Sequence, residues 1–173
     1  MRHLLLLTAG LLWVAFPAQA AVRHFRSPDG CYLASAASQP SDNGEGVVTL
    51  FRNGKRLCTR RSFVSGDGNH GEVVERAAWT PDSSFFVFTT FSSGGHSAWH
   101  HWTFVWSRRD NKIHSFDDAY QCTVTASFQV RKPDVLSTRV LDVHAVGDAT
   151  SPGAPITVRL SRVRWKPGAG MNR

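Results

Sequence analysis

Long apolar runs are almost absent from this chain, and the one exception lies at the N-terminus. There a short basic start precedes two apolar runs, the second of which ends at Phe16. The stretch is shorter than the ~20 residues that a membrane-spanning helix needs, and small residues at 17–20 match the positions that a signal peptidase reads. We therefore expect residues 1–20 to be a secretory signal peptide cleaved after Ala20. The processed chain is then periplasmic or secreted, without a membrane span.

Cysteine is also scarce, with only Cys31, Cys58 and Cys122 in the whole sequence. In an oxidising compartment, an odd number of cysteines favours one disulfide and one free thiol. The sequence does not choose among the three pairings, but Cys31 and Cys58 lie in the same short segment, so this pairing is the one we predict. A catalytic thiol needs a histidine and an electropositive pocket. Nothing in the sequence places a histidine beside any of the three.

Acidic residues are outnumbered, with 13 Asp and Glu against 20 Lys and Arg, which gives a formal net charge of +7. Loss of Arg2 with the signal peptide leaves +6. In the cytoplasm this balance would suggest nucleic acid, but an exported protein is expected to meet proteins or cell-envelope polyanions instead. The basic residues are dispersed, which is typical of solvated strand faces. We expect the pair Asp117-Asp118 to be a solvated strand end as well.

The sequence lacks the motifs of common catalytic sites. It has no Gly-x-Ser-x-Gly elbow, no Ser-x-x-Lys motif on a helix, and no Gly-rich loop opening a helix to hold phosphate. Paired carboxylates do not stand out either. These absences favour a protein that is not an enzyme and that has no cofactor.

What the sequence does contain is a repeat. Three Pro-Asp pairs recur at spacings of 53 and then 52 residues, and each lies between two strand-like runs. Proline presets φ and aspartate accepts hydrogen bonds from nearby backbone amides, so each pair predicts a tight turn between strands. The three pairs are Pro28-Asp29, Pro81-Asp82 and Pro133-Asp134.

Alternation of apolar and polar residues predicts strands around these turns. In the second unit Trp102, Phe104 and Trp106 fall on one face of such a strand. In the first unit Asn53-Gly54 joins two strand-like runs, and both residues tolerate the positive φ of a tight hairpin. The third unit has no clear fourth strand. The predicted strands are residues 31–36, 47–52, 55–63, 73–79, 85–91, 102–107, 113–116, 135–143 and 156–160.

The segment WTPDSSFFVF, followed by HWTFVWSRRDNKIHSF, resembles the PD-type and WD-type repeats of β-propellers. This resemblance implies an all-β, propeller-like fold of three consecutive antiparallel β-meander units of about 50 residues each. Propellers close with more blades than three, so a β-sandwich or a barrel built from the same hairpins is the alternative. We expect one β domain over 21–166 and a flexible tail at 167–173. The stretch SSGGHSAWHHW also resembles a motif of uncharacterised exported bacterial proteins, which implies no activity.

In an antiparallel unit of four strands, the first and third turns lie at one end and the other connections lie at the opposite end. Four long loops, at 39–46, 65–72, 92–101 and 145–154, are therefore expected opposite the Pro-Asp turns. Loops on a rigid scaffold carry a disproportionate share of binding residues. The predicted binding residues of this loop face are His70, His96, Trp99, His100 and His101.

A divalent metal site at His96 and His100, with His70 as a third ligand, is the sharpest hypothesis for this face. Imidazole suits zinc or copper, and a catalytic zinc has three protein ligands. The four-residue spacing of His96 and His100 brings side chains together on a helix, whereas Gly94-Gly95 favours a loop. A packed loop with aromatic anchors is therefore favoured over a metal site.

Three functions remain compatible with the sequence. The favoured one is an exported, non-enzymatic binding or interaction module whose ligand the sequence does not name. The second is a metal-binding protein or metal-dependent enzyme that uses the His70, His96 and His100 loop face. The third is an inhibitor of cell-wall lytic enzymes, a class that includes small exported β proteins with a disulfide, although the basic charge argues against it.

Overall fold

The computed structural model of the chain describes residues 21–38, 46–62, 71–92, 100–120, 122–141 and 153–166. The predicted signal peptide at 1–20 and the predicted tail at 167–173 lie outside these ranges. Among the described residues, no helix is long and apolar enough to cross a membrane.

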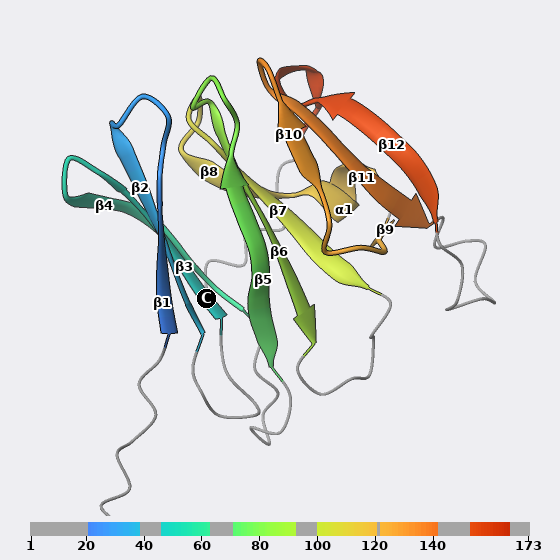
Figure 1. The fold of residues 1–173 in the computed structure, drawn as a ribbon, viewed down its shortest axis with the longest axis horizontal. Helices are drawn as coiled ribbons and strands as arrows, with labels where there is room; N and C mark the ends of the chain where they lie inside the picture. The colour runs from blue at the N-terminus through green and yellow to red at the C-terminus, as the bar shows by residue number, and fades with distance from the viewer. Residues whose placement is uncertain are drawn as a thin grey trace, which may run out of the picture.

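The described strands form three antiparallel sheets, one after another along the chain (Figure 1). Sheet 1 contains β1 (Ala21–Arg26), β2 (Tyr32–Ser38), β3 (Gly46–Arg52) and β4 (Lys55–Arg61). Sheet 2 contains β5 (Glu72–Trp79), β6 (Phe85–Ser92), β7 (His101–Ser107) and β8 (Lys112–Ser115). The predicted all-β fold of three consecutive antiparallel units is confirmed. It is neither a two-sheet sandwich nor one sheet closed on itself.

Sheet 3 is built around a central strand and is less regular than the other two. It contains β9 (Cys122–Thr123), β10 (Gln129–Arg131), β11 (Val135–Leu141) and β12 (Ala154–Arg159). Both β9 and β10 pair with β11, so the first strand of this unit is interrupted. After β12 the described chain enters a 3-10 turn, Leu160–Arg162, in place of a fourth strand. The prediction that the third unit lacks a fourth strand is confirmed for the described residues.

The first two Pro-Asp turns have the same hydrogen-bond pattern. Asp29 Oδ1 accepts a hydrogen bond from Ser27 Oγ, and Asp82 Oδ1 accepts one from Thr80 Oγ1, both at 2.6 Å. In the third turn Lys132 takes the place of the hydroxyl residue, so this local bond cannot form. The hydroxyl that precedes Pro-Asp is therefore part of the turn signal.

The turns also contact one another across the sheets. The backbone N–H of Asp29 donates to Ser83 Oγ at 3.0 Å, which joins the first turn to the second. The N–H of Asp82 donates to the Pro133 carbonyl at 3.3 Å, which joins the second turn to the third. The three Pro-Asp turns therefore gather at one end of the molecule, called the turn end below.

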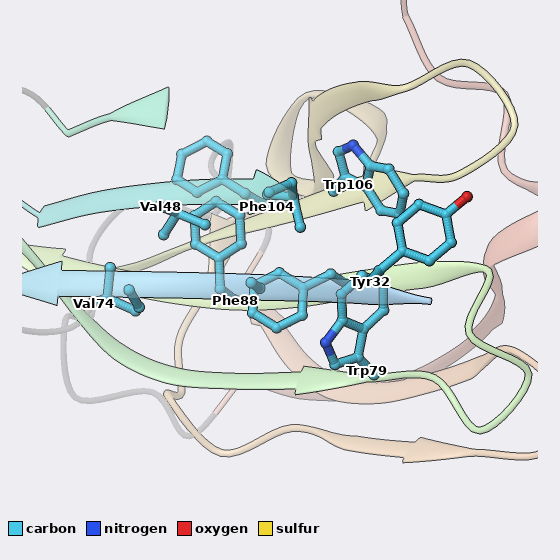
Figure 2. Close-up of a cluster of buried hydrophobic side chains, with 11 residues drawn as sticks. Tyr32, Val48, Val74, Trp79, Phe88, Phe104 and Trp106 are labelled. Carbon is cyan, nitrogen blue, oxygen red and sulfur yellow. The ribbon is translucent and has the colours of Figure 1, made fainter. Parts of the chain in front are cut away.

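Sheets 1 and 2 pack face to face through an aromatic core (Figure 2). The Tyr32 ring of β2 lies 5.3 Å from Trp106 of β7, and Trp79 of β5 lies 5.0 Å from Phe86 of β6, measured between ring centroids. Tilted aromatic pairs at this distance contribute about 0.5–1.5 kcal/mol each beyond the area they bury. This core joins the first repeat to the second.

Sheet 2 is buried on its other face as well, against sheet 3. Phe86 and Phe88 of β6 face sheet 1, whereas Phe85 and Val87 pack into a second core with Leu136 of β11. A strand buried on both faces reads as a continuous apolar run and not as an alternating one. The dense Phe-Phe-Val-Phe sequence of β6 follows from this central position.

The predicted Cys31–Cys58 disulfide is not formed, and both cysteines are free. Cys58 of β4 pairs with Leu50 of β3, which in turn pairs with Ala34 of β2, so an entire strand separates the two cysteines. Two strand spacings amount to about 10 Å, whereas a disulfide needs Cα atoms within roughly 7 Å. Proximity in the sequence was misleading because the chain crosses the sheet twice between the two residues.

Candidate functional site

The end of the sheets opposite the turn end carries the strand termini that border the long loops (Figure 1). We call it the loop-bearing end. The described residues at these termini are Ser38, Gly46, Arg61, Glu72, Ser92, His101, Leu141 and Ala154. The predicted separation into a turn end and a loop-bearing end agrees with the described strands. The predicted residues His70, His96 and Trp99 lie outside the described residues.

Sheets 1 and 2 approach each other closely at Gly46, the first residue of β3. A Cβ atom at this position would lie 2.8 Å from the Glu72 carbonyl oxygen and 3.0 Å from Ser62 Oγ. No side chain fits there without a shift of the β5 backbone. Glycine at 46 therefore lets the loop-bearing ends of the two sheets meet.

His100 is buried beneath this end and forms a hydrogen bond with Asp117 of α1 (Phe116–Ala119). The distance from His100 Nε2 to Asp117 Oδ2 is 2.7 Å, and the two side chains are only 7% and 5% exposed. The His100 ring also lies 4.0 Å from the Trp102 ring, between centroids. Asp117 was expected to be solvated, and this expectation was wrong.

The position of Asp117 follows from the short turn that carries it. Ser115 caps α1 by accepting a hydrogen bond from Asp118 N, and Phe116 is fully buried in the second core. With Phe116 anchored, the next side chain turns inward, where Thr123 Oγ1 of β9 donates to Asp117 Oδ1 at 3.0 Å. Burial raises the pKa of the Asp117 carboxyl, although the hydrogen bond with His100 acts in the opposite direction.

Glu72 and Arg60 add two more charged groups to the same end. Thr90 Oγ1 donates to Glu72 Oε2 at 2.9 Å. Burial raises the pKa of Glu72, while the Thr90 hydroxyl and the Arg60 guanidinium oppose that shift. The Arg60 guanidinium lies 3.7 Å from the centroid of the Phe104 ring, and burial lowers its pKa. Together Arg60, Glu72, His100 and Asp117 form what we call the buried polar cluster.

The neighbouring histidine does not join this cluster. His101 Nδ1 lies 2.9 Å from Glu75 Oε2 of β5, whereas His100 contacts α1. Adjacent residues of a strand point to opposite faces, so the two imidazoles diverge. Of the predicted site residues that the structure describes, His100 lies in the buried polar cluster and His101 lies outside it.

In the described part of the chain, no group of three or more His, Cys, Asp or Glu side chains could hold a metal ion. The Nε2 atom of His100 is already engaged with Asp117. A metal-ligating histidine commonly makes such a bond through its second nitrogen, so a metal would have to approach Nδ1. The other proposed ligands, His70 and His96, lie outside the described residues.

A second pair of the same type lies at the turn end and serves as a comparison. His114 Nε2 lies 2.8 Å from Asp110 Oδ2, and the His114 ring stacks 4.9 Å from Trp165. Asp110 is 39% exposed, whereas Asp117 is 5% exposed. The two pairs share their chemistry and differ in burial and in their place on the molecule.

Sequence reasoning found His100 but missed its partners. Arg60 was interpreted as one of many dispersed cations, Thr90 lay within a predicted strand, and Thr123 was given no role. Asp117 is buried because α1 directs its side chain inward, and no local sequence pattern predicts this burial. A usable signal was the position of Glu72 at the border of a predicted long loop.

No family model, curated protein or solved structure matches this chain. Its function is therefore inferred from its own residues.

Proposed function

We propose that this protein is an exported, non-enzymatic binding module that engages a partner through the loop-bearing end. The observation that supports this most is the buried hydrogen bond between His100 and Asp117, just before β7. This contact fixes the position of His100, from which the chain enters β7. Rigid positioning of loops is what a binding surface requires.

Burial of the charged groups of the buried polar cluster lowers the stability of the fold, which supports a role for the cluster beyond packing. The raised pKa values of Glu72 and Asp117 mean that ionising them in the folded protein costs free energy relative to the unfolded chain. An apolar cluster of similar volume is often at least as stable as buried ion pairs. Groups with shifted pKa values are enriched at functional sites, and the two carboxyls whose pKa is raised, Glu72 and Asp117, both lie at the loop-bearing end.

Binding is favoured over catalysis because an oriented imidazole alone does not complete an acyl-transfer site. Such a site needs a nucleophile within hydrogen-bond reach of the imidazole. At His100 the Nε2 atom is engaged by the Asp117 carboxylate, 2.7 Å away. Asp117 is instead held by Thr123, which makes it a structural support.

Export is the other half of the proposal and has its own test. Strand β1 begins at Ala21, the first residue after the predicted cleavage site, so removal of residues 1–20 leaves all described strands intact. We expect expression of the full chain in a bacterium with two membranes to yield periplasmic protein whose sequenced N-terminus is Ala21. Cytoplasmic protein that retains Met1 would contradict export.

The binding site is tested by removing each of the two His–Asp pairs in turn. Residues 21–173 are immobilised, a partner is isolated from cell-envelope extract and purified, and its Kd is measured for Asp117→Ala and for Asp110→Ala. We expect Asp117→Ala to weaken binding about tenfold or more, because loss of a charged hydrogen bond of 1.5–3 kcal/mol frees the base of the loop. Asp110→Ala removes the equivalent His–Asp contact at the turn end, and this variant should bind the partner with the wild-type Kd.

Circular dichroism and a cooperative thermal transition establish that both variants are folded. Equal loss of binding in the two variants would mean that the effect is general and not specific to the loop-bearing end. Unchanged affinity in Asp117→Ala would place the partner elsewhere on the molecule.

A further inference from the structure

The outer face of sheet 1, which faces away from sheet 2, is uncovered among the described residues and has an ordered composition. Residues that pair across the four strands form rows on this face. The row nearest the turn end has apolar residues in the middle and an arginine at each edge. Its members are Arg26, Leu33, Phe51 and Arg56.

The next two rows continue this pattern. One combines an imidazole with three hydroxyl groups, and the other combines three apolar residues with an arginine. The first consists of His24, Ser35, Thr49 and Thr59, and the second of Val22, Ala37, Val47 and Arg61. Three arginines and a histidine thus surround apolar positions, and these three rows contain no acidic residue.

A hollow of about 520 Å³ lies on this face at its turn end. Leu33 and Phe51 supply its apolar wall, and both are only partly buried. Arg26 and His24 line it as well, and the Arg26 guanidinium lies 3.4 Å from the Gly30 carbonyl oxygen, which keeps it over the hollow. A volume of 300–1,000 Å³ with apolar walls and a few polar groups is typical of small-molecule sites.

A second copy of this chain does not suit the face. The remaining outer face of the stack, on sheet 3, also carries arginines: its row nearest the turn end consists of Arg131, Val135 and Arg159, of which Arg159 is paired with Asp134. Stacking sheet 1 of one copy on sheet 3 of another would bring arginines together, and like charges across an interface are unfavourable. Charge complementarity calls for an anionic occupant.

We infer that the hollow on sheet 1 binds a small amphipathic anion, with its apolar body on Leu33 and Phe51 and its anionic group on Arg26 and His24. Arginine pairs with carboxylate and phosphate groups through two parallel hydrogen bonds, which suits this arrangement. The site goes beyond the proposed function, because it lies at the turn end of sheet 1, far from the loop-bearing end. The test of this anion site is independent of any partner that binds at the loop-bearing end.

Cys31 offers a direct readout, because it is exposed and lines the hollow. Residues 21–173 are treated with iodoacetamide with and without monomeric decyl phosphate, and alkylation is followed by mass spectrometry of the Cys31 peptide. We expect decyl phosphate to protect Cys31, whereas decanol and inorganic phosphate at the same concentration do not. Cys58 is an internal reference, since burial raises its pKa to about 11 and keeps it slow to react.

The anionic contact is tested by charge reversal. Arg26→Glu should raise the Kd for decyl phosphate about tenfold or more, because it removes a charge-assisted hydrogen bond and places a carboxylate beside the anionic group. Arg162→Glu makes the same change at an exposed position outside sheet 1 and should leave the Kd unchanged. Equal losses in the two variants, or equal protection by decanol, would overturn the inference. Cosedimentation with phosphatidylglycerol vesicles, without protection by monomeric decyl phosphate, would also overturn it and identify a membrane-docking face instead.

Discussion

Replacing Trp106 with alanine is expected to lower the free energy of unfolding by about 3–5 kcal/mol, the usual cost of deleting a buried tryptophan. Trp106 is 1% exposed and lies 5.3 Å from the Tyr32 ring and 5.7 Å from the Trp79 ring. Its Nε1 also donates to Asn111 Oδ1 at 3.2 Å, which ties the β7–β8 turn to the core. Urea denaturation followed by far-UV circular dichroism measures the loss.

Trp102→Ala is the matched control, because it removes the same side chain from the same face of the same strand. Trp102 is 38% exposed and lies near the loop-bearing end of β7. Its loss should cost about 1 kcal/mol, a value typical of a partly exposed position. Similar losses for the two variants would mean that Trp106 is not at the centre of the interface between sheets 1 and 2.

Replacing Asp134 with alanine is expected to cost about 2–3 kcal/mol, since the carboxylate accepts hydrogen bonds from charged and backbone donors at a buried position. Its side chain is 2% exposed. It accepts from Ser161 N at 2.7 Å and from Arg159 Nε at 3.1 Å, and so joins the third Pro-Asp turn to the 3-10 turn after β12. The described part of the third unit ends in this 3-10 turn and not in a fourth strand, and the Asp134 contact stabilises that end.

Asp134 is also expected to make the free energy of unfolding depend on pH. Burial alone would raise the pKa of Asp134, but hydrogen bonds from Ser161 and Arg159 lower it overall. A carboxyl whose pKa is lower in the folded state stabilises the protein above its unfolded pKa of about 4, and this contribution is lost as the pH falls through the folded value. The unfolding free energies of wild type and Asp134→Ala should therefore converge below about pH 4.

Asp82→Ala is the control for the effect of burial, because Asp82 is the equivalent aspartate of the second Pro-Asp turn and is exposed. It accepts from Thr80 Oγ1 at 2.6 Å and from Ser84 N at 3.0 Å. Its loss should cost about 1 kcal/mol, as for an ordinary hydrogen bond. A larger loss in Asp82→Ala than in Asp134→Ala would contradict the role given to Asp134.

Local signals predicted most of the fold. Asn53-Gly54 forms the expected hairpin, with φ of 49° and 76° at its two residues. All nine predicted strands are observed, with ends within two residues of their predicted positions. Turn chemistry and strand alternation act over a few residues, and a single sequence shows both directly.

Long-range contacts could not be predicted in the same way. The Cys31–Cys58 pairing failed because the sequence predicts the strand at 47–52 but does not show that this strand lies between the other two in the sheet. Asp117 looked like a solvated strand end, yet the anchoring of Phe116 in the second core turns it inward toward Thr123. Each of these outcomes depends on how the sheets pack, and no pattern within one strand records that.

The most direct test of the stacked-sheet arrangement is a nuclear Overhauser spectrum of residues 21–173. The chain contains only two tyrosines, so the Tyr32 ring protons can be assigned readily. We expect cross-peaks from the Tyr32 ring to the rings of Trp106 and Trp79, whose centroids lie 5.3 and 6.0 Å away across the interface between sheets 1 and 2. A folded chain in which the Tyr32 ring shows no cross-peak to either tryptophan would contradict the face-to-face packing of the first two repeats.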